Sequence, residues 1–386
     1  MSTPTPSPER VYALTNAADG NAVAVFVRRE SGNLLPLTPP PPPGLPGPLA
    51  ADGVIRPLPA FPTGGLGAGG PLVSQSSLTL SDDGRFLFAV NPGSNDVSSF
   101  LVTPGGLQFA SKVPSGGVLP VSVTTFGNLV YVVNAVNNLV GTVGLDGAGT
   151  GQIAGFSVDL NGVLTPLEDS GRTLSSPVSG PAQVAFNATG TLLVVTELTA
   201  NRITVFQIEE DGRPGTMMEN PSAGRGPFGF AFNAQGHLIV SELGTLFVNN
   251  STVSSYAVDS SGKLTVISAA VPTKQSAACW IATTPDGRYS YSTNTLSGSI
   301  SGFSVTSNGE LSPISADGRT GVTGDTSLPI DMVIGADGRY LDVLTQGTQT
   351  ITTFRIGNNG CLTPVASVGN LPPLAVGLAI GKRSDL

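Results

Sequence analysis

Residues 180–206 read GPAQVAFNATGTLLVVTELTANRITVF and contain three short apolar runs separated by polar turns. The first run covers 182–186, the second covers 191–196 and is rich in β-branched residues, and the third covers 201–206. A polar turn that ends in glycine, at 187–190, separates the first two runs. Runs of this kind, bounded by such turns, predict three consecutive β-strands.

The same template recurs along the chain with a period of about 40–50 residues, which is typical of propellers and solenoids. An aromatic residue closes the third strand of each copy: Phe26, Phe100, Phe156, Phe206, Tyr256, Phe303 and Phe354. The second strands read VYALTN, FLFAVN, LVYVVN, TLLVVTE, HLIVSE, YSYSTN and YLDVLTQ. Turns such as DDGR and ADGR precede most of them, and Asp-Gly tolerates the positive φ that tight hairpins require. A second hairpin after the aromatic, as in DLNGVLTPL, supplies an outer fourth strand.

The two ends of the chain complement each other. The first copy starts at Val11 without an inner strand, and the chain ends with LAVGLAIG (374–381), an inner-strand pattern that nothing follows. Pairing these ends closes a ring and removes exposed sheet edges. We therefore predict an all-β, seven-bladed propeller of four-stranded antiparallel blades. It forms a single domain over 1–386, with a tail at 1–10 and a Pro/Gly-rich insertion at 39–70.

Composition narrows the possible partners and the compartment. A formal net charge of −8 argues against nucleic acid or an anionic membrane as a partner. There is no apolar run of about 18 residues to span a membrane, and the N-terminus lacks the pattern of a signal peptide. Cys279 and Cys361 are too few for a disulfide framework, which favours free thiols. We expect a cytoplasmic protein with a small-molecule ligand and no cofactor; the sequence leaves the oligomeric state open.

The repeated pattern resembles a known family. DGR-x-L-x-V-x-N, then V-x-x-F-x-V, then GxLxP, repeated around a ring closed by the terminal strand, is similar to the lactonase-type seven-bladed propellers. That family includes 6-phosphogluconolactonases and the fungal carboxymuconate-lactonising cyclases. The resemblance covers nearly the whole chain, but the repeated motif is structural, and propellers host many functions. It therefore implies the fold more specifically than the activity.

Strand direction predicts where a site lies. The start of each inner strand and the end of each second strand share one face around the central channel, which we call the top face. Inner strands place Ser77, Ser122, Gln183, Phe228, Trp280 and Asp331 there. Second strands end there in Asn91, Asn134, Glu197, Glu242 and Asn294. Entering loops add Arg172, Arg225, Lys274 and Arg319.

Most of these residues also have a structural interpretation. Asn at a strand end commonly bonds its own backbone, and this applies to Asn134 and Asn294. Trp280 and Phe228 are either packing residues or the platform of a ligand site. Asp331 either caps a backbone amide or faces the channel. Arg225, flanked by glycines in AGRGPFGF, has the strongest claim to a substrate-binding role among the loop cations.

Glu197 and Glu242 replace the Asn found at the same position of other blades. A carboxylate at the mouth of an apolar channel loses solvation, a cost usually associated with function. The segment that ends in Glu197 and Leu198 is similar to the acidic N/T-E-L segment of lactonases. Two carboxylates on one rim disfavour double ionisation, so we expect at least one raised pKa. A structural, hydrogen-bonded Glu197 is the alternative.

The sequence also departs from the family. Family members often carry His, or Arg followed by His, where an inner strand begins; here those places read PVSV (120–123) and PAQV (181–184). The single histidine, His237, follows a turn on the opposite, bottom face. No Ser–His–Asp triad, Cys–His pair or His metal cluster is present. Calcium held by Glu, Asp and Asn oxygens has no supporting spacing, so no metal is expected.

Two hypotheses follow. The first is a lactonase-like enzyme that hydrolyses a lactone, or performs a related cyclisation or isomerisation, at the top of the channel. Glu197 is then the general base and Gln183 a donor to the developing oxyanion. The missing basic residues favour a neutral substrate over a phosphorylated one. The second hypothesis is a non-catalytic propeller that binds a ligand or protein on its top face.

Overall fold

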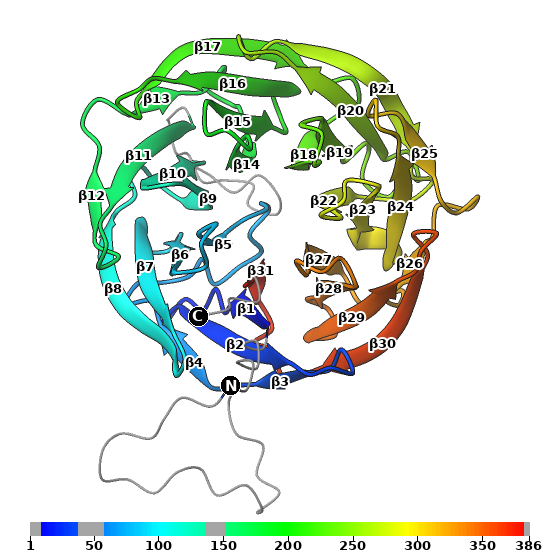
Figure 1. The fold of residues 1–386 in the computed structure, drawn as a ribbon, viewed down its shortest axis with the longest axis horizontal. Coiled ribbons are helices and arrows are strands. Elements are labelled where there is room, and N and C mark those ends of the chain that lie inside the picture. The colour runs from blue at the N-terminus through cyan, green and yellow to red at the C-terminus, as the bar shows by residue number, and fades with distance from the viewer. Residues whose placement is uncertain (1–8, 38–57, 136–150, 382–386) are drawn as a thin grey trace, which may run out of the picture.

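The computed structural model describes residues 9–37, 58–135 and 151–381. They fold into seven antiparallel sheets arranged as blades around a central axis (Figure 1). The helix that the described residues contain is a short 3-10 turn, η1 (Thr295–Ser297). The predicted all-β seven-bladed propeller is therefore confirmed. Residues 39–57 of the predicted insertion lie outside the described residues, as do residues 1–8 of the predicted tail.

Three blades come from the first part of the chain and from its end. From the axis outward, blade 1 contains β31 (Val376–Ile380), β1 (Arg10–Leu14), β2 (Ala22–Arg28) and β3 (Leu34–Pro36), and β4 (Ala60–Pro62) also pairs with β2. Blade 2 contains β5 (Leu78–Leu80), β6 (Phe86–Asn91), β7 (Asp96–Thr103) and β8 (Gly106–Pro114). Blade 3 contains β9 (Pro120–Phe126), β10 (Leu129–Asn134), β11 (Gln152–Val158) and β12 (Leu164–Pro166), and β13 (Arg172–Thr173) also pairs with β11.

The other four blades follow in chain order. Blade 4 contains β14 (Pro181–Phe186), β15 (Leu192–Glu197), β16 (Arg202–Ile208) and β17 (Pro214–Pro221). Blade 5 contains β18 (Pro227–Phe232), β19 (Leu238–Glu242), β20 (Thr252–Val258) and β21 (Leu264–Pro272). Blade 6 contains β22 (Ala278–Thr283), β23 (Tyr289–Asn294), β24 (Ser299–Val305) and β25 (Leu311–Pro313), with β26 (Gly321–Val322) paired to β24. Blade 7 contains β27 (Pro329–Ile334), β28 (Tyr340–Thr345), β29 (Thr350–Ile356) and β30 (Leu362–Val368).

The C-terminal strand closes the ring as predicted. β31 pairs antiparallel with β1, in a register that places Val11 opposite Ile380 and Leu14 opposite Val376. It occupies the innermost position of blade 1, beside the axis (Figure 1). The strand that the sequence assigns to 374–381 is therefore the inner strand of the blade that begins the chain.

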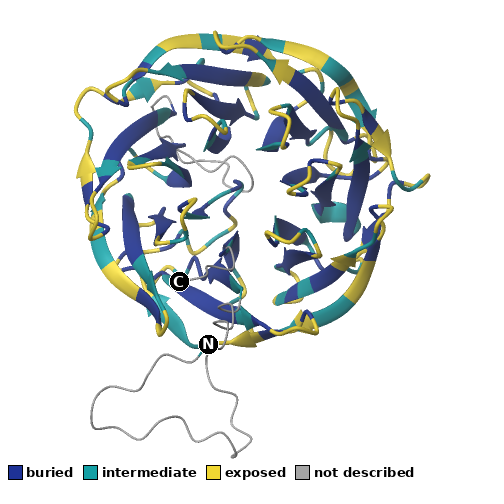
Figure 2. Ribbon diagram, viewed as in Figure 1, coloured by how far each residue is buried: buried dark blue, intermediate teal, exposed yellow. Residues whose placement is uncertain are grey.

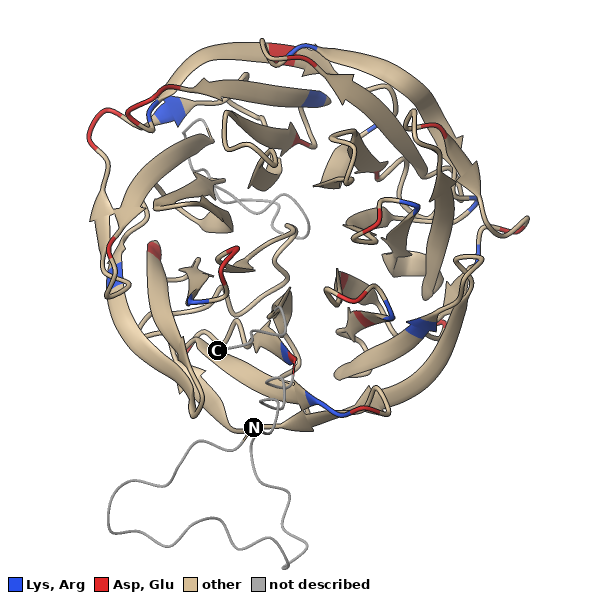
Figure 3. Cartoon of the chain, viewed as in Figure 1, with Lys and Arg blue, Asp and Glu red and all other residues tan. Residues whose placement is uncertain are grey.

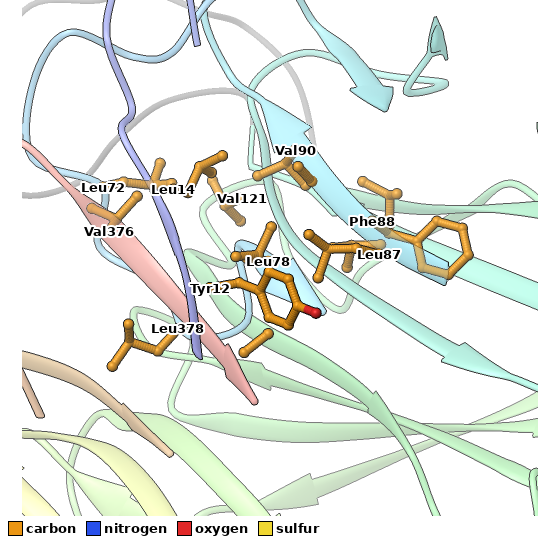
Figure 4. Packing of buried hydrophobic residues seen from close by; sticks show 14 of the residues in the cluster. Tyr12, Leu14, Leu72, Leu78, Leu87, Phe88, Val90, Val121, Val376 and Leu378 are labelled. Atoms are coloured by element: carbon orange, nitrogen blue, oxygen red, sulfur yellow. The ribbon is translucent and has the colours of Figure 1, made fainter. Parts of the chain in front are cut away.

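The core lies between the blades. The aromatic residue predicted to close each third strand is at most 1% exposed in all seven blades. Buried residues fill the ring, while exposed residues follow its outer edge and the turns (Figure 2). Leu72, Leu14, Val121 and Val376 gather beside β31 and β1, so residues of several blades share one core near the axis (Figure 4).

Most inner strands begin with the same irregularity. In β9, β14, β18, β22 and β27 the pairing register shifts near the first residues. Such a bulge leaves backbone groups outside the ladder, and hydroxyls of the preceding blade bond them. The hydroxyl of Thr196 donates to the Phe228 carbonyl and that of Ser241 to the Cys279 carbonyl. At these bulges, hydroxyl groups tie blade 4 to blade 5 and blade 5 to blade 6.

Candidate functional site

A polar contact recurs where the second strand ends in blades 2 to 5. A hydroxyl in the loop entering the blade donates to the Asn or Glu side chain at the end of the strand. We call the four contacts the linker clasps: Thr63–Asn91 at 2.7 Å, Ser115–Asn134 at 2.7 Å, Ser175–Glu197 at 2.6 Å and Ser222–Glu242 at 3.3 Å. The two glutamates therefore occupy the position that asparagine holds in blades 2 and 3.

Glu197 is wholly buried. One carboxylate oxygen accepts a hydrogen bond from the Ser175 hydroxyl, and the other accepts from the Thr204 hydroxyl on β16 and, at 3.4 Å, from the Ser175 amide. Burial raises the pKa of Glu197 above its ordinary value, and these hydrogen bonds oppose the shift. Ser175 itself is half-buried, so it is the more accessible member of the pair.

Glu242 is also wholly buried and has more donors. It accepts hydrogen bonds from the Thr252 and Ser254 hydroxyls of β20, from the Gly224 amide at 2.7 Å and from Ser222. Burial raises the pKa of Glu242, and hydrogen bonds, chiefly those from Ser254 and Thr252, oppose the shift. Its carboxylate lies in a closed polar shell, consistent with a structural role.

The raised pKa values of Glu197 and Glu242 have the same main cause. Burial, rather than mutual repulsion, is the main cause of the raised pKa of both Glu197 and Glu242, and the Glu219 carboxylate adds to the shift of Glu197. Each side chain bonds to its own blade and to the loop that enters that blade. The sequence-based expectation of a raised pKa was right, but its cause is desolvation.

The asparagines at the same position have structural partners. Asn134 is buried, and it both accepts from the Ser115 hydroxyl and donates at 3.1 Å to the Ser115 carbonyl. Asn294 donates to the Ser299 and Ser301 hydroxyls at 3.1 and 2.9 Å. Its carbonyl oxygen is buried and has no hydrogen-bond partner within the described chain, since blade 6 lacks a linker clasp. Both side chains are wholly buried in this structure.

A segment before β5 bridges the top of the channel. Residues 72–76, which we call the crossing segment, extend from the wall of blade 2 toward the axis (Figure 1). Ser74 donates to the Val121 carbonyl at 2.8 Å, and the Gln75 amide donates to the Ala182 carbonyl at 2.9 Å. The Gln75 side chain both donates to and accepts from the backbone of Ile281, at 2.8 and 3.0 Å. The crossing segment thereby joins blades 3, 4 and 6.

The crossing segment covers Trp280 and Phe228, for which the sequence allowed either packing or a ligand platform. The Trp280 indole N–H donates to the Ser74 carbonyl at 2.9 Å, and its ring meets Phe228 edge to face at 5.0 Å. Trp280 is 4% exposed and Phe228 is 0% exposed. These two rings therefore pack in the protein interior, because residues 72–76 occupy the space above them that a ligand would need.

Gln183 and Glu197 face opposite sides of blade 4. The Gln183 side chain is buried and accepts a hydrogen bond from the Phe230 amide of blade 5 at 2.6 Å. Thr196 also bonds to blade 5, and Glu197, the next residue of the strand, faces the other way because strand side chains alternate. Gln183 is thus not placed to stabilise an oxyanion formed beside Glu197.

Asp331 is a buried carboxylate in the channel wall. It is 3% exposed and accepts hydrogen bonds from the Met332 and Leu378 amides, both at 2.8 Å. Burial raises its pKa to about 7, against the effect of these two hydrogen bonds. Its backbone is held at a φ of 33°, an uncommon conformation for a residue other than glycine. Of the two interpretations, the structure shows the cap of a backbone amide.

Arg225 lies beside a groove on the top face, between blades 4 and 5. The groove has a volume of about 560 Å³ and is lined by Leu198, Leu243, Leu246 and Arg225 among others.

A second cavity of about 530 Å³ opens at the bottom end of the channel, where Phe186 and Phe232 line it. Charged residues lie mainly in the turns and near strand ends (Figure 3). Within the described chain, no three His, Cys, Asp or Glu residues gather as metal ligands, and no helix has the length and apolarity to cross a membrane.

Comparison with known proteins agrees with this architecture. The model of the family described as "Lactonase, 7-bladed beta-propeller" matches residues 150–279. Over these residues the chain is similar to the lactonase-type seven-bladed propellers. The matched residues include blades 4 and 5, and therefore Gln183, Glu197, Arg225 and Glu242. No curated protein matches the chain in sequence.

Solved structures share the fold of this propeller over nearly its whole length. A proposed 6-phosphogluconolactonase from Bacteroides fragilis is 21% identical, covering 98% of this chain and 99% of its own, with a TM-score of 0.70. The periplasmic gluconolactonase of Pseudomonas aeruginosa is 19% identical, covering 98% of this chain and 100% of its own, with a TM-score of 0.69. At these identities the likeness concerns the fold.

Sequence reasoning missed three parts of the top face. Ser175 had a usable signal, because a hydroxyl recurs in the loops that enter neighbouring blades. Gln75 had no such signal, because the repeat pattern does not predict a contact across the channel between Gln75 and Ile281. The groove between blades 4 and 5 was missed because two of its three leucines, Leu198 and Leu243, directly follow the two glutamates, which were the more unusual residues.

Proposed function

We propose that the protein is a lactonase-like enzyme that acts on an uncharged lactone, or performs the related cyclisation or isomerisation, at the top face. The observation that carries this proposal is the Ser175–Glu197 pair. A half-buried hydroxyl donates at 2.6 Å to a wholly buried carboxylate whose pKa is raised by burial. A raised pKa brings a carboxylate closer to the range in which a general base is most effective at neutral pH.

The reaction then runs through Ser175, because Glu197 itself does not reach solvent. A water molecule attacks the lactone carbonyl and passes its proton to the Ser175 oxygen, while the Ser175 proton passes to Glu197. Collapse of the tetrahedral intermediate breaks the ring C–O bond. The leaving alkoxide recovers the proton along the same path, and the product is a hydroxy acid. Serine is the relay and Glu197 the base.

An uncharged substrate fits the surroundings of Ser175. Recognition of a phosphate or a polycarboxylate commonly uses Arg in a forked, charge-assisted contact. The nearby Arg172 donates instead to the Asp169 and Gly171 carbonyls of its own loop, at 2.8 and 2.9 Å. The starts of β9 and β14 carry no basic residue.

A non-catalytic, ligand-binding propeller is the second candidate. The recurrence of the linker clasps in blades 2, 3 and 5 favours it, because Ser175 and Glu197 then have the same structural role as Ser115 and Asn134. The crossing segment favours it too, since it fills the top of the channel near Trp280.

The test compares variants of the clasp against a panel of aliphatic γ- and δ-lactones, with 6-phosphogluconolactone as the anionic comparison and ring opening followed by pH-stat. Glu197→Gln and Ser175→Ala are expected to lower kcat by roughly 10²-fold or more, the usual scale for loss of a general base, without a change in folding. Glu242→Gln and Ser115→Ala are the matched controls and are expected to retain activity. No turnover of any lactone by the unmodified protein, or full activity of Glu197→Gln, favours the binding propeller.

A further inference from the structure

The groove between blades 4 and 5 has a glycine floor. Gly226 has a φ of 73°, and a Cβ added there would lie 3.1 Å from the Leu198 side chain and 3.4 Å from that of Leu243. The absence of a side chain keeps the space between these two half-buried leucines open. The loop is fixed on both sides: Gly226 donates to the Asn201 side chain at 2.7 Å, and Leu243 donates to the Gly226 carbonyl at 2.8 Å.

The walls of the groove are apolar and its rim carries one cation. Leu198, Leu243 and the exposed Leu246 supply the apolar surface, and Arg225 supplies the charge. The Arg225 guanidinium has a weak contact at 3.4 Å with the Thr245 hydroxyl. No carboxylate of the described residues lies within ion-pair distance of it, although Glu242 is buried behind the neighbouring Gly224. The remaining lining residues are uncharged.

We infer that this groove binds a small molecule with an apolar chain and a carboxylate head. The chain lies between Leu198 and Leu243 over Gly226, and the head pairs with Arg225, whose planar fork matches a carboxylate. A volume of about 560 Å³ is that of a small-molecule site. In a chain with a formal net charge of −8, an exposed arginine that has no carboxylate partner among the described residues can pair with an external anion. The inference is independent of lactone hydrolysis.

Octanoate, 1-octanol and acetate separate the two parts of the interaction. Octanoate has both chain and charge, 1-octanol has the chain alone, and acetate has the charge alone. Binding is measured by calorimetry and located by NMR of ¹³C-labelled leucine methyl groups. We expect octanoate to bind more tightly than the other two and to shift the methyl signals of Leu198, Leu243 and Leu246.

Two variants test the assignment. Arg225→Gln is expected to weaken the binding of octanoate by about tenfold, which corresponds to about 1.4 kcal/mol, and to leave the binding of 1-octanol unchanged. Leu246→Ser is expected to weaken the binding of both compounds. Arg172→Gln, on another top-face loop, is the control and should change neither. Both side chains changed in the groove are exposed, so folding is expected to persist. The inference would be overturned if Arg225→Gln bound octanoate as tightly as the unmodified protein. It would also be overturned if octanoate shifted only the methyl signals of other leucines, or if octanoate showed no saturable binding.

Discussion

Arg28 on β2 and Asp342 on β28 form a buried ion pair between blade 1 and blade 7. Their side chains are 6% and 0% exposed. Arg28 also donates to Glu9 at 2.6 Å, and the Thr353 hydroxyl donates to Asp342 at 2.7 Å. The same two blades meet where β31 completes the ring, so the pair lies at the seam between the first and last parts of the chain.

Removing one member of this pair should cost more than removing both. Arg28→Met leaves Asp342 buried without its cation, and breaking a buried pair in this way typically costs about 3–5 kcal/mol. The double variant Arg28→Met/Asp342→Leu replaces both charges with apolar side chains, and is expected to recover most of the loss. Urea unfolding of the three proteins gives the comparison. If the double variant is as unstable as Arg28→Met, the seam depends on the charges themselves.

Deleting residues 374–386 should open the ring. The deletion removes β31, leaves β1 without its inner neighbour and removes the Leu378 amide that bonds to Asp331. We expect a large fall in melting temperature and exposure of the apolar surface around Leu14 and Leu78, measured by calorimetry and by binding of a hydrophobic dye. A truncated protein that melts like the full chain would rule out closure by this strand.

The single tryptophan should report the crossing segment. Trp280 is 4% exposed beneath Ser74, so its emission is expected to be blue-shifted and weakly quenched by acrylamide. Gln75→Ala removes the paired hydrogen bonds to Ile281 and should increase quenching by loosening the segment. Thr79→Ala, on the following strand, is a control expected to leave quenching unchanged. Strong quenching in the unmodified protein would show that the top of the channel is open in solution.

Asp331 should make stability depend on pH. Burial raises its folded-state pKa to about 7 from 3.8, so the folded protein binds this proton more tightly than the unfolded chain. Stability from this group is therefore fully present below about pH 4 and is lost as pH rises toward 7. Asp331→Asn should flatten the decline between these values, measured by urea unfolding at a series of pH values. An equal slope in both proteins would assign the decline to other groups.

The repeat pattern predicted the fold because propeller strands are specified locally. Alternating apolar residues, Asp-Gly turns and a closing aromatic such as Phe206 each act within one blade, and ring closure followed from the unpaired end at 374–381. The top face was harder to predict. Whether Trp280 is open or covered depends on residues 72–76, which reach it across the channel and have no repeat position.

Glu197 and Glu242 illustrate the same limit at the level of single residues. Their unusual character was visible as a substitution for asparagine, and their raised pKa values followed from burial. Their partners were not visible, because Ser175 and Ser222 lie in loops of different length and sequence. The position in the strand was predictable, whereas the direction of each side chain required the register of its own blade.

The two glutamates should behave as independent groups. Each carboxylate accepts hydrogen bonds from its own blade and entering loop, and burial is the main cause of the raised pKa of each. The stability losses of Glu197→Gln and Glu242→Gln should then add in the double variant to within about 0.3–0.5 kcal/mol, as for separate sites. Urea unfolding measures the sum, and ¹³C NMR of the side-chain carboxyls measures whether Glu197→Gln moves the titration of Glu242. A coupling energy well above that range, or a lowered pKa of Glu242 when Glu197 is neutralised, would instead indicate that the two charges share one site.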